Sequence, residues 1–143
     1  MEIREEKPKL EEKDRKEAEE EKLLGTKFFK ESKFEEALGH YEAAIEKYPL
    51  ETFFYTNKAA CLIKMEKFLE AISVCDQALE ICNKNEPYNY EKKGKVYFRK
   101  ASAYQQMKDY ASAIDYYHKS LVENNTPDTK EALIKCKQEM KKK

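Results

Sequence analysis

The stretch KFEEALGHYEAAIEKYP, residues 33–49, recurs twice further along the chain. KFLEAISVCDQALEICN at 67–83 and DYASAIDYYHKSLVENN at 109–125 align with it without gaps. Each copy has an aromatic residue, then alanine three positions later, then leucine or isoleucine, and finally alanine or serine seven positions after the first alanine. The second copy follows the first by 34 residues and the third follows the second by 42, which leaves eight extra residues near 84–93. The chain is therefore an array of three repeats.

A second amphipathic segment precedes each copy, so every repeat predicts a pair of helices. The repeats span about 18–51, 52–85 and 94–127. Large apolar residues alternate with glycine or alanine in the first helices, because two helix backbones approach closely only where a side chain is small. These positions are Leu24, Gly25 and Phe28 in the first repeat, Tyr55, Ala59 and Leu62 in the second, and Tyr97, Ala101 and Tyr104 in the third. The pattern predicts an all-α fold.

Composition supports a single helical domain. The chain has 143 residues, of which 41% are hydrophobic and 39% charged, and glycine and proline together number only seven. Such a composition favours long solvated helices around one core. The net charge is zero, so no overall field attracts nucleic acid or an anionic membrane. We expect neither as a partner, and any anion site must be local.

Targeting and redox features point to the cytoplasm. The first residues, MEIREEKPKL, contain no apolar signal segment, and no window approaches the roughly 18 apolar residues of a membrane span. The four cysteines have no CxxC spacing and lie within helical apolar patterns; they are Cys61, Cys75, Cys82 and Cys136. Buried reduced thiols are therefore expected in place of disulfides or a zinc site. No metal or other cofactor is expected.

The two ends of the chain differ from the repeats. Residues 1–10 are interpreted as a linker or frayed start, and the charged run 11–22 as an extension of the first helix, so the repeat array occupies 11–126. Residues 127–143 predict one more helix, capped by Thr126 or Asp128 with Pro127 in its first turn. Leu133, Cys136 and Met140 would share one face and cover the apolar end of the array.

The repeat pattern resembles the tetratricopeptide repeat. The shared features are the period of 34, small residues at the eighth and twentieth positions, and a proline after the second helix, here Pro49. The resemblance implies a right-handed superhelical stack of three helix-turn-helix repeats followed by a C-terminal capping helix.

Polar side chains flank the apolar stripe of each first helix. In a curved stack the first helices line the concave side, so repeat positions 2, 5, 6 and 9 face the groove. Three cations and two hydrogen-bonding side chains occupy these positions: Lys22, Thr26, Asn57, Lys95 and Arg99. With no acid among them, they predict a channel for a peptide with clustered carboxylates, because arginine, lysine and asparagine all donate to carboxylate oxygens. The alternative is that each is an ordinary solvated charge on a helix.

These five positions resemble the carboxylate clamp of chaperone-binding tetratricopeptide domains. That pattern has lysine and asparagine on the first repeat, asparagine on the second, and lysine and arginine on the third. Thr26 departs from it, since asparagine is usual there. The resemblance implies that the groove holds the C-terminal aspartate of a cytosolic heat-shock chaperone by its side chain and terminal carboxylate.

One branch of that family is particularly similar. The eight-residue extension and the segment KSLVENNTPDTKEALIKC at 119–136 resemble the middle tetratricopeptide domain of the Hsp70/Hsp90 organising co-chaperones. The resemblance implies a preference for the heat shock protein 90 ending, Met-Glu-Glu-Val-Asp, and a module cut from a larger co-chaperone. The heat shock protein 70 tail, or an internal peptide bound by a scaffold of the same fold, remain the alternatives.

Three further residues are candidates for the peptide pocket. Phe29 can form an apolar wall or belong partly to the core. Lys64 and Lys92 can meet glutamates of the peptide or be simply solvated, and the solvated state is favoured.

Catalysis is not expected. His40 and His118 lie on second helices of different repeats, share no acid or cysteine, and no glycine-rich phosphate loop exists. A helical-repeat RNA reader would need a basic, aromatic-lined face and usually more repeats, which the zero net charge opposes.

Overall fold

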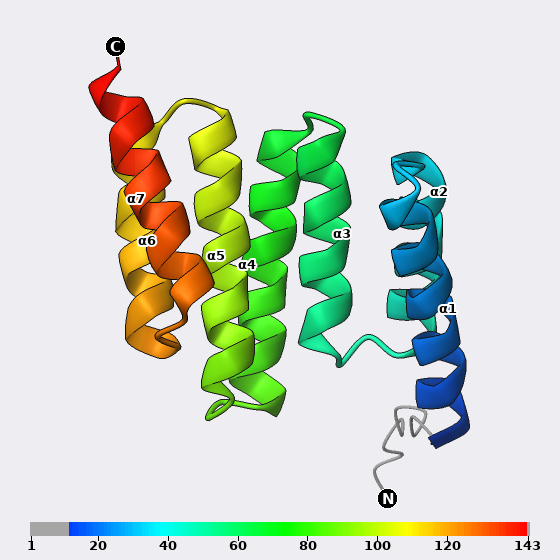
Figure 1. The fold of residues 1–143 in the computed structure, drawn as a ribbon. Coiled ribbons are helices and arrows are strands. Elements are labelled where there is room, and N and C mark those ends of the chain that lie inside the picture. Colours follow the sequence, from blue (N-terminus) through cyan, green and yellow to red (C-terminus); the bar gives the residue numbers. More distant parts are fainter. Residues whose placement is uncertain (1–11, 143) are drawn as a thin grey trace, which may run out of the picture.

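The computed structural model describes residues 12–142, and there it shows seven α-helices and no strand (Figure 1). The helices are α1 (Glu12–Lys30), α2 (Phe34–Lys47), α3 (Thr52–Lys64), α4 (Phe68–Asn85), α5 (Tyr90–Gln106), α6 (Tyr110–Glu123) and α7 (Pro127–Lys141). The first six form three antiparallel pairs side by side, and α7 follows them (Figure 1). The predicted all-α fold of helix-pair repeats is confirmed, whereas the linker expected at 1–10 lies outside the described residues. None of the described helices is long and apolar enough to cross a membrane.

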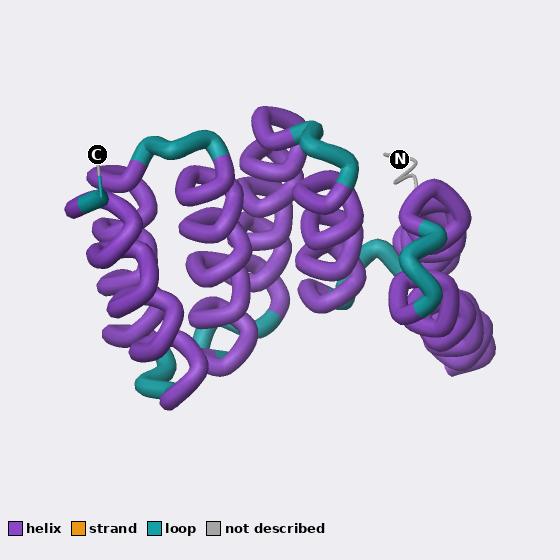
Figure 2. Tube along the Cα trace, turned by 45° about the horizontal axis from the view of Figure 1, so that its top comes forward, coloured by secondary structure: helices purple, strands orange, loops and turns teal. Residues whose placement is uncertain are grey.

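The three pairs turn with the same backbone geometry. Each turn holds one non-glycine residue in the left-handed region at the same repeat position: Ser32 (φ 62°), Glu66 (φ 63°) and Lys108 (φ 65°). The following amide donates to the carbonyl five residues earlier at 2.8–2.9 Å, which satisfies a carbonyl at the end of the first helix. The tube view shows the helices as pairs joined by these short teal loops (Figure 2). The repeat seen in the sequence is therefore a repeat of backbone conformation as well.

Small residues lie where the helices meet. Ala37, Ala71 and Ala113 of the second helices are fully buried. Gly25 on α1 is buried against α2, and a Cβ atom at this position would lie only 2.8 Å from Cε1 of Tyr41. Glycine is therefore required for α1 and α2 to approach as closely as they do.

The core continues from pair to pair. Tyr55 and Leu62 of α3, Val74 of α4 and Val96 of α5 belong to one buried cluster, so the second and third repeats share a continuous core. All four cysteines are buried and free, as the apolar pattern predicts. Leu24 was expected in the core but is 43% exposed.

The eight extra residues lengthen two helices. When the repeats are superposed by sequence, α4 continues for 82–85 beyond the end of α2, and α5 begins with 90–93 before the start of α3. The loops 48–51 and 86–89 are equally long. The insertion therefore adds about one helical turn to each of two neighbouring antiparallel helices.

Helix α7 begins as the sequence predicts. The Thr126 hydroxyl accepts a hydrogen bond from the Thr129 amide at 3.2 Å, and Pro127 follows in the first turn. Leu133 and Cys136 are buried in a cluster with residues of α6. Met140 was expected on the same packed face but is 41% exposed, because the end of α7 extends past α6 (Figure 1).

Candidate functional site

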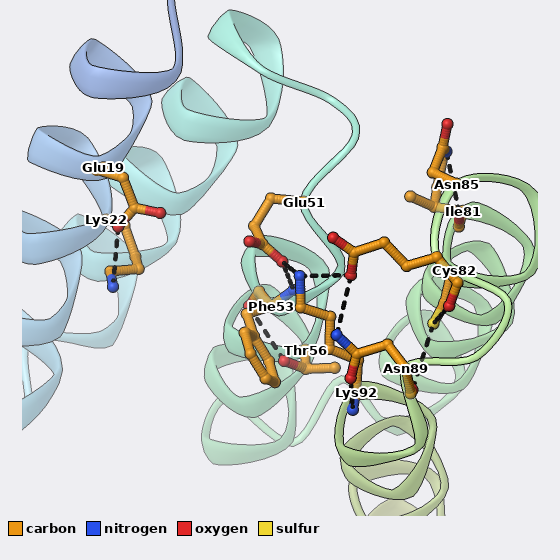
Figure 3. Close-up of polar contacts among 11 residues, drawn as sticks. Glu19, Lys22, Glu51, Phe53, Thr56, Ile81, Cys82, Asn85, Asn89 and Lys92 are labelled. Atoms are coloured by element: carbon orange, nitrogen blue, oxygen red, sulfur yellow. Dashed lines mark hydrogen bonds and ion pairs between the residues drawn. The ribbon is translucent and has the colours of Figure 1, made fainter. Parts of the chain in front are cut away.

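Helix α1 presents three of the candidate residues. Lys22, Thr26 and Phe29 follow one another by four and three positions, so they share one face of α1. The Lys22 ammonium lies 3.1 Å from Oε2 of Glu19 (Figure 3), an acidic partner that the five-residue pattern did not include. Both side chains are partly exposed, so the pair contributes at most about 1 kcal/mol and can exchange for a ligand carboxylate.

The Thr26 hydroxyl forms a hydrogen bond with the phenol hydroxyl of Tyr41 on α2. The two oxygen atoms are 2.9 Å apart, and Tyr41 is buried. Burial raises the pKa of Tyr41, although the hydrogen bond with Thr26 opposes the shift, so the phenol stays protonated at neutral pH. When Tyr41 donates to Thr26, the Thr26 hydrogen is left for an acceptor on a ligand. Thr26 is thus held in place by the second helix of its own repeat.

Asn57 is the candidate residue of α3. Its side chain is partly buried and makes no hydrogen bond with any of residues 12–142. An amide offers two donors and one acceptor oxygen, so Asn57 can still bind a peptide backbone or a carboxylate.

Lys95 and Arg99 lie one turn apart on α5. Their cationic groups are 5.6 Å and 5.9 Å from the centre of the Phe98 ring, within range of a cation–π interaction. In the described part of the chain no carboxylate lies within 4.0 Å of either cation. Burial lowers the pKa of Arg99. Partial burial and, next, the Arg99 charge lower the pKa of Lys95, although the Lys95 side chain keeps an exposed surface. Both side chains stay charged at neutral pH.

Arg99 has an unused donor. Its Nε atom is buried and has no hydrogen-bond partner. Tyr41, Cys61 and Cys75 are the groups that act electrostatically on it, and none is an anion at neutral pH. A buried charged group without a partner is costly, so this guanidinium is poised for an anion.

Arg99 opens onto a groove that the other two repeats share. The groove has a volume of about 290 Å³, and Phe29 of α1 and Lys64 of α3 line it together with Arg99. The structure thus brings three sequence-predicted residues, one from each repeat, to the same cavity. Four other predicted residues do not line it: Lys22, Thr26, Asn57 and Lys95. Lys95 lines a different groove, toward α7.

Lys92 does not fit either expectation made for it. It is buried, and its ammonium lies 2.7 Å from Oε2 of both Glu51 and Glu86 (Figure 3). The ammonium also lies 5.2 Å from the centre of the Phe53 ring. Burial by itself lowers the pKa of Lys92, but the hydrogen bonds and charges of Glu51 and Glu86 outweigh it and raise the pKa. Lys92 is therefore neither solvated nor free for a peptide, because the loops 48–51 and 86–89 supply its counter-ions.

The arrangement is suited to binding an anion. Residues 12–142 contain no group of three His, Cys, Asp or Glu placed to hold a metal ion. His40 is bonded to Glu21 at 2.8 Å and stacks on Phe28, which joins α1 to α2. Burial raises the pKa of Cys61 and of Cys75 to about 12, so neither thiol is a ready nucleophile.

Sequence patterns missed the role of Tyr41. It occupies the same repeat position as Cys75 and Tyr117, which suggests only a core residue. The contact between Tyr41 and Thr26 crosses the turn between α1 and α2, and no spacing rule within one helix reveals it.

Comparison with known proteins identifies the family of the chain. The tetratricopeptide repeat family model matches residues 52–121. The Hsp70-Hsp90 organising protein of Plasmodium falciparum is 41% identical over 118 residues, which cover 80% of this chain and 20% of that protein. The chain therefore spans about a fifth of the length of this relative.

Two solved structures have the same fold. The N-terminal domain of STI-1 from C. elegans is 31% identical with a TM-score of 0.73, and the match covers 89% of this chain and 99% of that domain. The TPR2AB domain of yeast Sti1, solved in complex with an Hsp90 peptide, is 33% identical with a TM-score of 0.78, covering 87% of this chain and 48% of that one. The chain therefore belongs to the tetratricopeptide-repeat family and is homologous to the tetratricopeptide-repeat domains of the Hsp70-Hsp90 organising proteins.

Proposed function

We propose that this chain is the peptide-binding module of a larger cytoplasmic co-chaperone, and that it holds the acidic C-terminal tail of heat shock protein 90. The clamp consists of Lys22, Thr26, Asn57, Lys95 and Arg99, and Phe29 and Lys64 extend it into a pocket. The module binds without catalysing a reaction.

The observation that supports this proposal best is the state of Arg99. Its buried Nε has no partner, and it borders a groove shared with Phe29 and Lys64. A free carboxylate supplies the missing acceptor, and the planar guanidinium can bind it with two parallel hydrogen bonds. Phe29 and Lys64 then offer an apolar surface and a cation for the valine and glutamates that precede the terminal aspartate. The Hsp90 peptide in the yeast Sti1 complex is a ligand of this kind.

Heat shock protein 70 is the second candidate partner. The name of the Plasmodium relative includes both chaperones, which supports testing the tail of heat shock protein 70 as well. The groove residues described above recognise the shared acidic ending and do not by themselves select one chaperone.

Calorimetric titration with peptides tests the proposal. The peptide Met-Glu-Glu-Val-Asp is compared as free acid and with its C-terminus amidated, and a heat shock protein 70 tail is titrated in parallel. We expect amidation to weaken binding at least tenfold, about 1.4 kcal/mol, because one carboxylate charge is lost from the clamp. Affinity for the free acid should also fall as salt rises. Equal affinity for the two forms would show a scaffold that binds internal peptides.

A further inference from the structure

A second groove lies on the other side of Lys95, between α5 and the beginning of α7. Its volume is about 440 Å³, and Lys95 and Phe98 line it from α5. Two acidic residues line it as well, Glu91 in the first turn of α5 and Asp128 in the first turn of α7. Both acidic residues are exposed. One clamp cation therefore shares a groove with two carboxylates that belong to the protein itself.

Glu91 and Asp128 act on Lys95 without being bonded to it. Their charges raise the pKa of Lys95, whereas burial and Arg99 lower it. Neither carboxylate lies within 4.0 Å of the ammonium, so no ion pair fixes Lys95 in the groove. At such separations the interaction is electrostatic, and the same two negative charges that attract the Lys95 ammonium repel any anion that approaches it.

We infer that Glu91 and Asp128 are specificity-determining residues of the clamp, an inference that rests on the proposed function. A carboxylate that reaches Lys95 is repelled by both acids, which weakens the hold on the tail. Further carboxylates of the ligand are disfavoured in the α7 groove, where two acids accompany one cation. They therefore lie on the side of Arg99 and Lys64, where two cations accompany one acid, Glu66. Helix α7 thus contributes to ligand selection in addition to covering the end of the array.

The position of each acid also has a structural explanation. Carboxylates in the first turn of a helix are favoured by the helix dipole. That effect accounts for an acid at either helix start, but it does not account for both acids lining the groove of a clamp cation. Stability and affinity must therefore be measured separately.

The test uses the variants Glu91→Gln, Asp128→Asn and the double variant. Glu131→Gln is the matched control, because it removes one exposed charge of α7 that is paired with Lys135 at 3.4 Å, and Glu131 does not line the groove. Dissociation constants for free-acid and amidated Met-Glu-Glu-Val-Asp are measured at low and high salt, with thermal melts of every variant.

We expect the double variant to bind the free-acid peptide three- to tenfold more tightly at low salt, and the gain to shrink at high salt. Glu131→Gln should bind like wild type. Unchanged or weaker binding by folded variants overturns the inference while leaving the clamp intact, provided that wild type still prefers the free acid. Loss of that preference in wild type overturns the proposed function and this inference together. If the double variant does not fold, the two single variants decide by the same criterion.

Discussion

The hydroxyl groups of Thr26 and Tyr41 lie 2.9 Å apart and join α1 to α2 beside the candidate clamp. Thr26 is the one clamp position that departs from the family pattern, and its side chain is already oriented by the protein. Tyr41 also acts electrostatically on Arg99 of α5. The Arg99 charge in turn lowers the pKa of Tyr41, so the phenol of the first repeat and the guanidinium of the third are near each other.

Replacing Thr26 by asparagine should strengthen binding. The asparagine oxygen can accept the Tyr41 hydrogen bond while its NH₂ group donates directly to a ligand carboxylate, which the shorter threonine hydroxyl reaches through a bridging water. We expect Thr26→Asn to gain up to about 1 kcal/mol in binding free energy, measured by titration with the free-acid peptide. Thr26→Val, which keeps the shape and removes the hydroxyl, should bind more weakly than wild type. Weaker binding by Thr26→Asn would show that the family role does not extend to this position.

We expect the cations of α5 to contribute to ligand affinity and not to the stability of the fold. Arg99→Ala and Lys95→Ala should each weaken binding of the free-acid peptide at least tenfold, about 1.4 kcal/mol, with little change in the thermal midpoint. Arg99→Lys keeps the charge and loses the planar fork, so its affinity should lie between those of wild type and Arg99→Ala. A large loss of stability with unchanged affinity would assign these residues to the core instead.

Lys92 should stabilise the fold. Lys92→Met leaves Glu51 and Glu86 without their shared cation, and breaking a buried ion pair in this way costs roughly 3 kcal/mol of unfolding free energy. Because its pKa is raised in the folded protein, this contribution is fully present below the unfolded pKa and is lost only as pH rises through the folded value, in the alkaline range. Lys84→Met is the control, since Lys84 forms an exposed pair with Glu80 at 3.2 Å. Chemical denaturation should show a change of under about 0.5 kcal/mol for the control.

Two glycines should respond in opposite directions to the same change. Gly25→Ala places a Cβ atom 2.8 Å from Tyr41 and should cost roughly 1–3 kcal/mol through overpacking. The Cβ atom that Gly39→Ala adds on α2 has no neighbouring atom within 4 Å. This variant should therefore raise the free energy of unfolding by about 0.5–1 kcal/mol through its higher helix propensity. Thermal melts of the two variants compare them directly. Equal stability of the two variants would show that α1 and α2 can move apart at Gly25 without lowering the free energy of unfolding.

The buried thiols should be unreactive in the folded chain. Because burial raises the pKa of Cys61 and Cys75 to about 12, alkylation by iodoacetamide near pH 8.5 should be far slower than in denaturant, as mass spectrometry of the labelled residues can show. The raised pKa of the two thiols also gives the direction in which stability changes with pH. Stability is unaffected below pH 9 and falls as pH rises from 9 toward 12, since the unfolded thiols ionise first. Rapid labelling of either residue at pH 8.5 would contradict this prediction.

The repeat pattern predicted the fold because its period is set by local helix packing. Small residues such as Gly25 and Ala37 mark the helix contacts, and the distances along the chain give the pairing. The left-handed backbone at Ser32, Glu66 and Lys108 could not be predicted from the sequence, because none of these residues is a glycine. Leu24 lies at the end of the described array, where periodicity alone does not show which apolar face has a neighbour to cover it.

The site was only partly predictable for a different reason. Spacing places Lys95 and Arg99 on one face of a helix, but it does not show which groups of other helices line the grooves beside them. Asp128 of α7 lies in the same groove as Lys95, yet the two residues are far apart in the sequence. The same holds for Lys92 and Glu51, whose contact depends on how the two loops of neighbouring repeats are stacked.

The matched lengthening of α4 and α5 limits how domains of this kind can vary in length. Four residues add about 6 Å to a helix and slightly more than one turn, so each side chain keeps nearly its original direction. Because the neighbouring helix gains the same height, every new backbone segment has a packed partner and the loop between them is unchanged. An insertion into one helix alone would leave its added turn without that support. Homologous domains should therefore differ at this point by about eight residues or by none, and a deletion of 82–85 together with 90–93 should fold better than a deletion of either segment alone.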